Sequence, residues 1–289
     1  MSDRFYLDSP SLVYRAFFSW PTTITDPAGR PVNAVRGFME MVTRMVVDHH
    51  PDDIVAVFDA EWRPAFRVEA YAGYKAERPD DPPELPAQFD VIAEVLDAAG
   101  ICCIEAPELE ADDAIATLIE DKEAAEMATV VTGDRDLLPL VRDPDVRLLF
   151  PLRGVRDVIV FDETAVDAKY GVPPRLYADF ATLRGDPSDG LPGVPGIGPV
   201  RAAKLLSEYG SVAGIIANLE ELPPTQKATF EEALDYLLAA RGVVELVRDA
   251  RLSATEPHPP ELDRLEFLGA EHNLGSSAVR LAQALAGER

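Results

Sequence analysis

The sequence predicts an α/β fold in which a mostly parallel sheet is flanked by helices. Short apolar runs rich in β-branched and aromatic residues alternate with helical patterns, an alternation typical of parallel sheets with right-handed crossovers. Several of these runs end in acidic residues. The chain has 289 residues, 47% of them hydrophobic, which suits one large domain or one domain with appendages.

Four apolar runs are the candidate strands, and the segments between them are candidate helices. In the last of these helices, apolar residues recur from Ala111 at the i, i+3, i+4, i+7 and i+8 spacing of an amphipathic helix. The strands are expected at residues 5–7, 54–58, 101–104 and 128–132, and the helices at about 35–47, at about 89–98 and from 111 onward.

The rest of the chain divides by its local pattern. Residues 146–161 predict a hairpin at the sheet edge, with two short strands flanking Arg153 and Gly154. A helical pattern starts near Pro173 and is interrupted at residues 185–198, and prolines make residues 256–260 extended. We therefore expect a core over residues 1–172, a subdomain over 173–218 and a helical C-terminal region over 219–289 that packs on the core.

Composition limits the class of protein. No apolar run approaches the roughly 18 residues of a membrane span, and no signal-peptide pattern opens the chain, so a cytoplasmic protein without a membrane partner is expected. Cys102 and Cys103 are adjacent, which predicts reduced thiols rather than a disulfide or a zinc site. The net charge of −24 alone argues against nucleic acid, unless carboxylates hold divalent metals that reverse the local charge.

Acidic residues cluster at or just beyond the predicted strand ends. In open parallel sheets the carboxyl ends of the strands share one edge, where ligands bind, so these side chains are expected to converge. Helix capping or turn formation explains each acid taken singly, but the joint pattern favours a site. The acids are Asp8, Asp59, Glu110 (with Glu108 as a weaker member), Asp134 and Asp136 at strand ends, Asp112 and Asp113 in a first helical turn, and Asp186 and Asp189 in a later loop.

Converging carboxylates repel one another, and divalent cations with oxygen ligands relieve that repulsion. Mg²⁺ fits such a site, whereas the four histidines show no zinc-ligand spacing. Two Mg²⁺ ions about 4 Å apart activate a water and stabilise the leaving oxygen in phosphodiester hydrolysis. The sequence therefore predicts a metal-dependent phosphodiester chemistry.

Two segments have the composition of nucleic-acid contacts. Gly193, Gly196 and Gly198 precede a helix that carries Arg201 and Lys204, an arrangement that can bind a duplex backbone through helix amides; an ordinary helix start is the alternative. The second segment, residues 62–78, mixes cations with aromatic residues, which suits single-stranded DNA; a solvated helix face with core aromatics is the alternative. Its members are Arg63, Arg67, Lys75 and Arg78 with Phe66, Tyr71 and Tyr74.

Seven motifs occur in an order that resembles the 5′ nuclease domain of bacterial DNA polymerase I, within the flap endonuclease family. The similarity runs from about Phe5 to Gly210. The motifs are LVYRAFF at residues 12–18, NAV at 33–35, VFD at 57–59, YKA at 74–76, EADD at 110–113, TGDRDLL at 132–138 and GVPGIG at 193–198.

The resemblance implies a PIN-like fold with a helical arch and a helix-hairpin-helix subdomain that binds duplex DNA with K⁺. It implies 5′-3′ exonuclease and 5′-flap endonuclease activity on DNA ends, flaps and single-strand/double-strand junctions, with Mg²⁺ or Mn²⁺. All nine acids match family metal ligands, and Tyr74, Lys75 and Arg78 match family residues that steer the phosphate. Arg67 also matches a family position. We expect Arg67 and Tyr74 to contact DNA, and the glycine segment with its Arg201 and Lys204 to do the same.

Two local departures and three alternatives accompany this resemblance. Ser9 follows Asp8 where relatives have glycine, and Gly190 follows Asp189 where relatives have asparagine, so the second metal environment is expected to differ. Without a polymerase region, the chain is expected to be a stand-alone nuclease. The alternatives are a non-cleaving protein that binds branched DNA, a PIN-type ribonuclease, and an RNA–DNA hybrid as the substrate.

Overall fold

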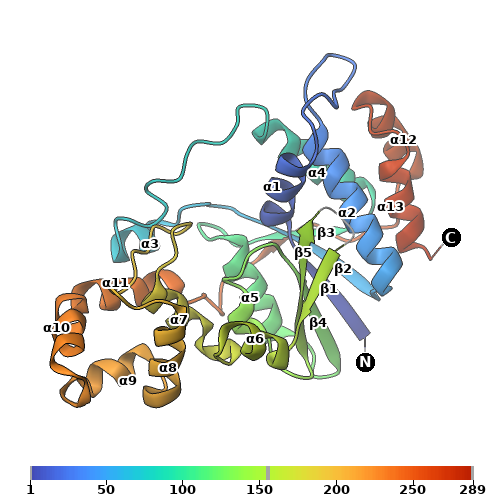
Figure 1. The fold of residues 1–289 in the computed structure, drawn as a ribbon. Coiled ribbons are helices and arrows are strands. Elements are labelled where there is room, and N and C mark those ends of the chain that lie inside the picture. Colours follow the sequence, from blue (N-terminus) through green and yellow to red (C-terminus); the bar gives the residue numbers. More distant parts are fainter. Residues whose placement is uncertain (1, 154–156, 288–289) are drawn as a thin grey trace.

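The computed structural model describes residues 2–153 and 157–287, and its centre is a seven-stranded sheet (Figure 1). The strand order is β6-β5-β4-β1-β2-β3-β7, and β1 to β5 are parallel to one another. The strands are β1 (Ser2–Asp8), β2 (Asp53–Phe58), β3 (Cys102–Glu105), β4 (Glu126–Val131), β5 (Val146–Arg153), β6 (Asp157–Phe161) and β7 (Ser253–Ala254). The predicted α/β class and the four central strands are confirmed.

The connections reverse direction at the centre of the sheet. From β1 the chain passes through α1 (Ser9–Ser19) and α2 (Asn33–His49) to β2, and then through α4 (Pro86–Ala98) to β3. It returns through α5 (Ala111–Asp121) to β4 on the other side of β1. The carboxyl ends of β1 and β4 therefore flank the switch point, where open α/β sheets bind their ligands.

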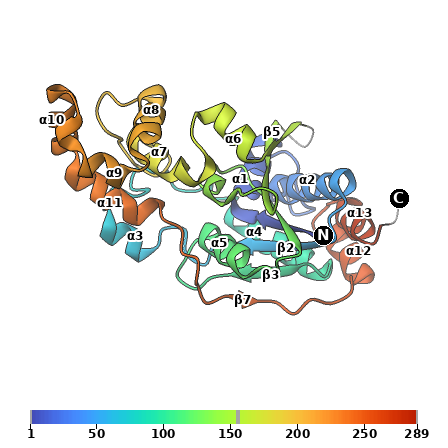
Figure 2. The same ribbon diagram turned by 90° about the horizontal axis from the view of Figure 1, so that it is seen from below.

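Alternation along the strands builds one core on each face of the sheet. Phe5 and Leu7 of β1 pack with α1, α2 and α4, whereas Tyr6 between them packs with α5 and the helices beyond it. Successive strand side chains point to opposite faces, and a strand covered on both faces reads as a continuous apolar run. Figure 2 shows helices on both sides of the sheet.

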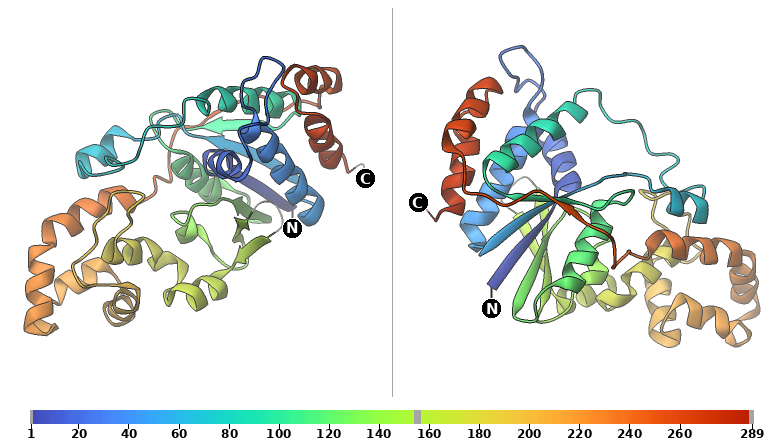
Figure 3. Two further views of the ribbon diagram at one scale, coloured as in Figure 1. Left: turned by 45° about the horizontal axis from the view of Figure 1, so that its top comes forward. Right: turned by 180° about the vertical axis from the view of Figure 1, so that it is seen from behind.

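Both edges of the sheet are antiparallel. β6 pairs with β5 as a hairpin, as predicted from residues 146–161; Gly154, which that prediction also named, lies outside the described residues. β7 pairs with β3 and belongs to the segment between α11 and α12, which runs across the back of the sheet (Figure 3). The strand β7 was not predicted, because two exposed residues carry no apolar pattern.

The C-terminal region divides between two places. Helices α10 (Pro224–Glu232) and α11 (Leu234–Val244) lie with the other helices that follow β6, and α11 contacts α3 and α7. Helices α12 (Leu262–Glu271) and α13 (Ser277–Leu285) pack beside α2 and α4 (Figure 3). The helices that follow β6 also include α6 (Glu163–Tyr170), α7 (Tyr177–Arg184), α8 (Pro199–Tyr209) and α9 (Val212–Ala217), with short 3₁₀ turns at 174–176 and 219–221. Another 3₁₀ turn, at 138–140, lies between β4 and β5.

The predicted arch is only partly helical. Between β2 and α4 the structure has a single short helix, α3 (Ala65–Ala70), then turns at 72–77, a stretch without regular structure at 78–82 and a turn at 83–84. Pro79, Pro82 and Pro83 account for the lack of helix there, because proline disfavours helix both at its own position and at the residue before it. Among the described residues, no helix is long and apolar enough to span a membrane.

Candidate active site

The carboxyl ends of β1 and β4 are joined through one buried hydroxyl. Thr132 Oγ1 donates to Asp8 Oδ2 at 2.5 Å and accepts from the Asp134 amide at 2.8 Å. Asp8 also caps α1, because its Oδ1 accepts from the Ser11 amide at 3.3 Å. Asp8 and Asp134 therefore meet at the switch point, as the sequence predicted for strand-end acids.

The end of β2 is fixed to the start of α5. Asp59 Oδ1 accepts from the Ala111 amide at 2.7 Å, so Asp59 satisfies one of the free amides of the first helical turn. This contact holds the turn that carries Glu110 and Asp112 beside the end of β2. Carboxylates near a helix N-terminus also gain from the helix dipole.

Two clefts open on either side of the converging acids. The first has a volume of about 290 Å³ and faces α7 and the 186–190 loop, whereas the second, of about 430 Å³, faces α1. Glu110, Asp112 and Asp134 line both clefts. Asp136 and Asp189 line the first, and Asp8 and Asp59 line the second. Of the nine predicted ligands, Asp113 and Asp186 line neither cleft in the described part of the chain.

Removal from solvent and mutual repulsion make these acids hard to ionise. Burial raises the pKa of Asp8 to about 7, with the charges of Asp134 and Asp59 adding to the effect. Burial raises the pKa of Asp59 to about 6 and that of Asp189 to about 6. The pKa values of Asp112 and Asp136 also lie well above the ordinary range, because both are enclosed and both face other carboxylates. A divalent cation is the species that would relieve this repulsion.

The donor set fits a hard divalent cation. In residues 2–153 and 157–287, no group of three His, Cys, Asp or Glu side chains is arranged so that it could hold a metal ion by itself. Mg²⁺ does not require one, because it keeps several waters and is held by one or two carboxylates in most sites. Hard oxygen donors with raised pKa values, lining two adjoining clefts, suit that kind of binding.

Lys75 and Arg78 reach the acids from residues 71–78, and both line the two clefts. The Lys75 ammonium contacts Glu110 Oε1, and the pKa of Lys75 is raised because Glu110 and Asp189 outweigh the effect of burial. The Arg78 guanidinium lies 5.4 Å from the ring centre of Tyr14, a cation–π distance. The two cations predicted to steer a phosphate thus lie beside the predicted ligands.

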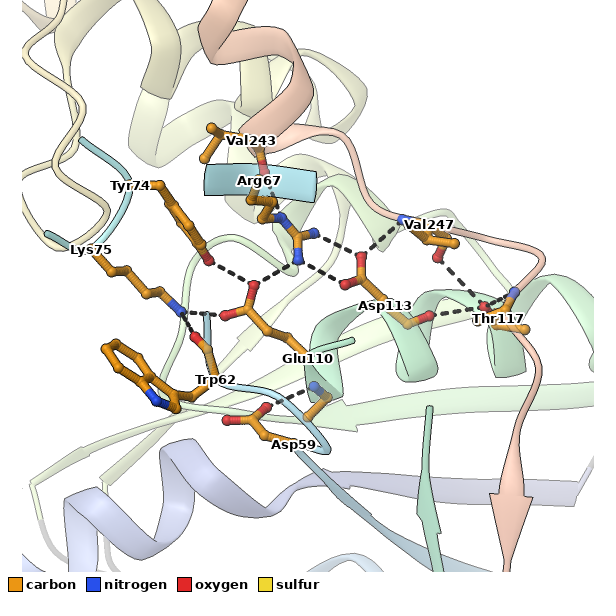
Figure 4. A network of polar contacts seen from close by, with 12 residues as sticks. Asp59, Trp62, Arg67, Tyr74, Lys75, Glu110, Asp113, Thr117, Val243 and Val247 are labelled. Atoms are coloured by element: carbon orange, nitrogen blue, oxygen red, sulfur yellow. Dashed lines mark hydrogen bonds and ion pairs between the residues drawn. The ribbon is translucent and has the colours of Figure 1, made fainter. Parts of the chain in front are cut away.

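Arg67 and Tyr74 are buried, although the sequence predicted that both contact DNA. Each side chain is only 3% exposed. The Tyr74 hydroxyl donates to Glu110 Oε2 at 2.6 Å, and Arg67 bonds to Glu110 and Asp113 (Figure 4). The alternation of cations and aromatics could not reveal this, because a buried ion pair and a solvated cation look alike in sequence.

The loop that carries Asp186 and Asp189 is tied to the base of the arch. The Lys75 amide donates to the Asp189 carbonyl at 3.1 Å. Gly190 has a φ of +73°, and a Cβ atom there would lie 2.2 Å from the Gly73 carbonyl oxygen. Asp186 instead forms a local turn, because its Oδ1 accepts from the Ser188 amide at 3.1 Å and its Oδ2 contacts Arg184. Asp189 is therefore at the cleft and Asp186 is set back.

The glycine segment forms the link between α7 and α8. Gly193 and Gly196 have positive φ values of 73° and 76°, as predicted for a tight hairpin. Gly198 is the residue before α8, and Lys204 on that helix is exposed. Arg201 is also exposed, but its Nη1 donates back to the Gly196 carbonyl at 2.9 Å. The exposed start of α8 is thus available for an anion.

One face of α1 was missed by the sequence analysis. Ser11, Tyr14, Arg15 and Phe18 all line the second cleft, and their spacing of three and four residues places them on one helix face. Ser11 Oγ accepts from the Gly133 amide at 2.9 Å. The helical spacing within residues 11–18 is the signal that could have identified this wall, but the helix follows β1 without a loop.

Two family models together span most of the chain. The 5′-3′ exonuclease N-terminal resolvase-like domain matches residues 4–171, and the 5′-3′ exonuclease C-terminal SAM fold matches residues 172–263. Their boundary lies one residue from the start of the predicted 173–218 subdomain.

Similar proteins and structures agree with these matches. A 5′-3′ exonuclease of Streptomyces coelicolor is 46% identical over 299 residues, which cover 96% of this chain and 99% of that protein. DNA polymerase I of Mycobacterium bovis is 41% identical over 92% of this chain and 29% of its own length. The bacteriophage T5 flap endonuclease, in a complex with DNA and metal ions, shares the fold with a TM-score of 0.67 at 17% identity, covering 98% of this chain and 99% of that one.

These relatives do not favour a non-cleaving DNA-binding protein or a PIN-type ribonuclease. The converging carboxylates, the adjoining clefts and the family matches agree with one another along the chain. The chain therefore belongs to the 5′-3′ exonuclease family of nucleases.

Proposed function

We propose that this nuclease hydrolyses DNA at 5′ ends, 5′ flaps and single-strand/double-strand junctions, using Mg²⁺ or Mn²⁺. One observation carries the proposal: the acids at the sheet switch point line two adjoining clefts, and Lys75 and Arg78 line both as well. A phosphodiester drawn to these cations would lie against the carboxylates. The bacteriophage T5 enzyme that shares this fold was solved with DNA and metal ions.

Divalent ions held here would supply an activated water and charge stabilisation at the scissile phosphate. Seven carboxylates would hold them, and the two adjoining clefts suit a two-metal site. Lys75 and Arg78 would orient the phosphate, and Thr132 would keep Asp8 aligned. The seven are Asp8, Asp59, Glu110, Asp112, Asp134, Asp136 and Asp189. Asp186 would hold the loop that carries Asp189.

The duplex would lie across the link between α7 and α8. Gly193, Gly196 and the exposed start of α8 offer backbone amides to phosphates without reading sequence, and Arg201 and Lys204 add positive charge. We propose this unit, within residues 173–218, as a helix-hairpin-helix with a K⁺ site. Residues 1–172 would then cut, and residues 219–289 would support both parts.

The test is cleavage of a labelled 5′-flap duplex by the wild type and by Asp134→Ala, with EDTA, Mg²⁺ or Mn²⁺. We expect metal-dependent cutting near the junction that the variant loses by at least about 100-fold, since its carboxylate lines both clefts. An RNA strand in place of the flap tests the hybrid substrate. Binding without cutting in either metal would overturn the enzymatic proposal, and undiminished cutting by the variant would show that the site is misplaced.

A further inference from the structure

Asp113 stands apart from the other predicted ligands. We infer that Asp113 is a positioning residue that locks Arg67 against the back of Glu110, and that it does not bind metal. The inference rests on the proposed function, because Glu110 is a proposed ligand. It also assigns a role to the segment that follows α11, which no motif in the sequence indicated.

Arg67 is the centre of a buried network (Figure 4). Its Nη1 donates to Glu110 Oε2 at 2.6 Å and to Asp113 Oδ2 at 2.7 Å, and its Nη2 donates to Asp113 Oδ1 at 2.7 Å. Its Nε donates to the Val243 carbonyl at 3.0 Å. Four of the five guanidinium hydrogens are used, so the planar fork has one orientation.

Both oxygens of Asp113 accept hydrogen bonds from buried donors and face away from the clefts. Its side chain is fully buried, and Oδ1 accepts from the Val247 amide at 2.9 Å in addition to Arg67. Its neighbour Asp112 lines both clefts. Adjacent helical residues point about 100° apart, so one acid of the pair faces the clefts and the other faces the core. A metal ligand at 113 would require breaking the buried ion pair.

The network holds Glu110 from behind. Tyr74 and Arg67 both donate to Oε2, and Lys75 contacts Oε1 on the cleft side. If Lys75 turns to a phosphate, Oε1 becomes free while Oε2 keeps two donors. Glu110 can then offer one oxygen to a metal without changing its position, which is the kind of support that ligand carboxylates receive from surrounding hydrogen bonds.

The segment after α11 completes the arrangement. Near the end of α11, the Val243 carbonyl accepts from Arg67. Just after α11, the Val247 amide donates to Asp113. Thr117 Oγ1, one turn further along α5, accepts from the Ala250 amide at 3.1 Å and fastens the same segment. Three parts of the chain, α3, the start of α5 and residues 243–250, thus meet behind Glu110.

The test compares Asp113→Asn with Asp112→Asn, its neighbour on the same helical turn. Asparagine at 113 turns an amide toward Arg67 Nη1, so a donor faces a donor. We expect the metal-free Tm to fall by about 5 °C or more, because a buried ion pair is broken, and kcat to fall about 10–100-fold with KM for the flap substrate changed by less than about threefold. Asp112→Asn removes a repelled carboxylate, so its metal-free Tm should rise while Mn²⁺ binding weakens.

Two controls separate positioning from simple stability. Asp48→Asn breaks an exposed pair with Arg44 and should change neither Tm nor kcat. Rates are measured well below each Tm, so that only folded protein is compared. Arg67→Lys should show the same kcat loss as Asp113→Asn, because a lysine cannot hold both carboxylates as a planar fork does.

Each outcome has one meaning. If Asp113→Asn raises the metal-free Tm and weakens Mn²⁺ binding as Asp112→Asn does, Asp113 is a ligand and the inference is wrong. If its Tm falls but its kcat stays at the wild-type value, the ion pair is only structural and the inference is also wrong. Wild-type protein that neither binds Mn²⁺ nor cuts DNA would overturn the proposed function itself, and the inference with it.

Discussion

At the scale of single residues, Thr132 shows how an uncharged side chain can organise a charged site. It is fully buried, and its hydroxyl joins Asp8 to the Asp134 amide. The hydroxyl donates its only hydrogen to the carboxylate, which fixes one Asp8 oxygen and favours the ionised form. The other oxygen, Oδ1, accepts from the Ser11 amide.

Replacing Thr132 by valine should therefore reduce activity. Valine has the same shape but no hydroxyl, so Asp8 loses its donor and the Asp134 amide loses its acceptor. We expect a 10–100-fold loss of rate at limiting Mg²⁺ and a loss of about 1–3 kcal/mol in the free energy of unfolding. Initial rates against Mg²⁺ concentration and urea unfolding measure the two effects. Thr132→Ser keeps the hydroxyl and is the control; equal rates for both variants would refute the role of the bond.

At the scale of elements, the 186–190 loop depends on a backbone contact with the arch. Gly190 lies against the Gly73 carbonyl, and the Lys75 amide donates to Asp189. The contact couples Asp189 to the same turn that presents Lys75.

Gly190→Ala should separate the loop from the arch. The left-handed conformation costs alanine about 1–2 kcal/mol, and the new Cβ would also meet the Gly73 carbonyl oxygen at 2.2 Å, so the backbone must move. Gly29 has a φ of +83° with nothing within 4 Å of a built Cβ. Gly29→Ala therefore has the same strain without the clash. We expect both variants to lose stability and only Gly190→Ala to lose flap cleavage by about tenfold or more; unchanged cleavage by Gly190→Ala would argue against the coupling.

Helices α12 and α13 belong to the core of the nuclease, although they lie last in the chain. Leu265 is fully buried against the side of the sheet that α2 and α4 cover, whereas Leu262 on the same helix is 53% exposed. Leu265→Ala should lower the free energy of unfolding by about 2–5 kcal/mol. Leu262→Ala should lower it by less than about 0.5 kcal/mol. Chemical denaturation distinguishes them, and similar values for the two would mean that α12 is not packed as described.

At the scale of the whole molecule, the acidic site makes the metal-free protein sensitive to pH. Asp8, Asp59 and Asp189 have folded pKa values of about 7, about 6 and about 6, above their ordinary value of 3.8. At pH values between the ordinary pKa of 3.8 and the folded values, the folded state binds more protons than the unfolded state. The stabilising contribution of these groups is therefore complete below about pH 4 and is lost as pH rises through 6 to 7.

The metal-free Tm should consequently be higher at pH 5.5 than at pH 7.5, and Mg²⁺ should raise the Tm more at pH 7.5. Calorimetry in EDTA and in Mg²⁺ at both pH values measures this. Asp8→Asn removes the group with the highest of the three pKa values and should flatten the metal-free dependence. A metal-free Tm that increases from pH 5.5 to pH 7.5 would contradict the repulsion between the acids.

The sequence alone determined the sheet and the place of the site. Apolar runs of three to five residues that alternate with helical patterns are typical of buried strands, and parallel strands bring their carboxyl ends to one edge. Asp8, Asp59 and Asp134 could be placed together for that reason. The glycine segment was equally local, because a positive φ is a property of one residue.

Only the tertiary structure decided what each acid does within the site. Asp112 and Asp113 are adjacent and chemically identical, but one lines the clefts and the other is buried against Arg67. The partners that decide this, Arg67 and the Val247 amide, lie 46 and 134 residues away. Local sequence sets the direction of a side chain on its own helix, but a buried charge is defined by the groups that satisfy it, and those come from distant parts of the chain.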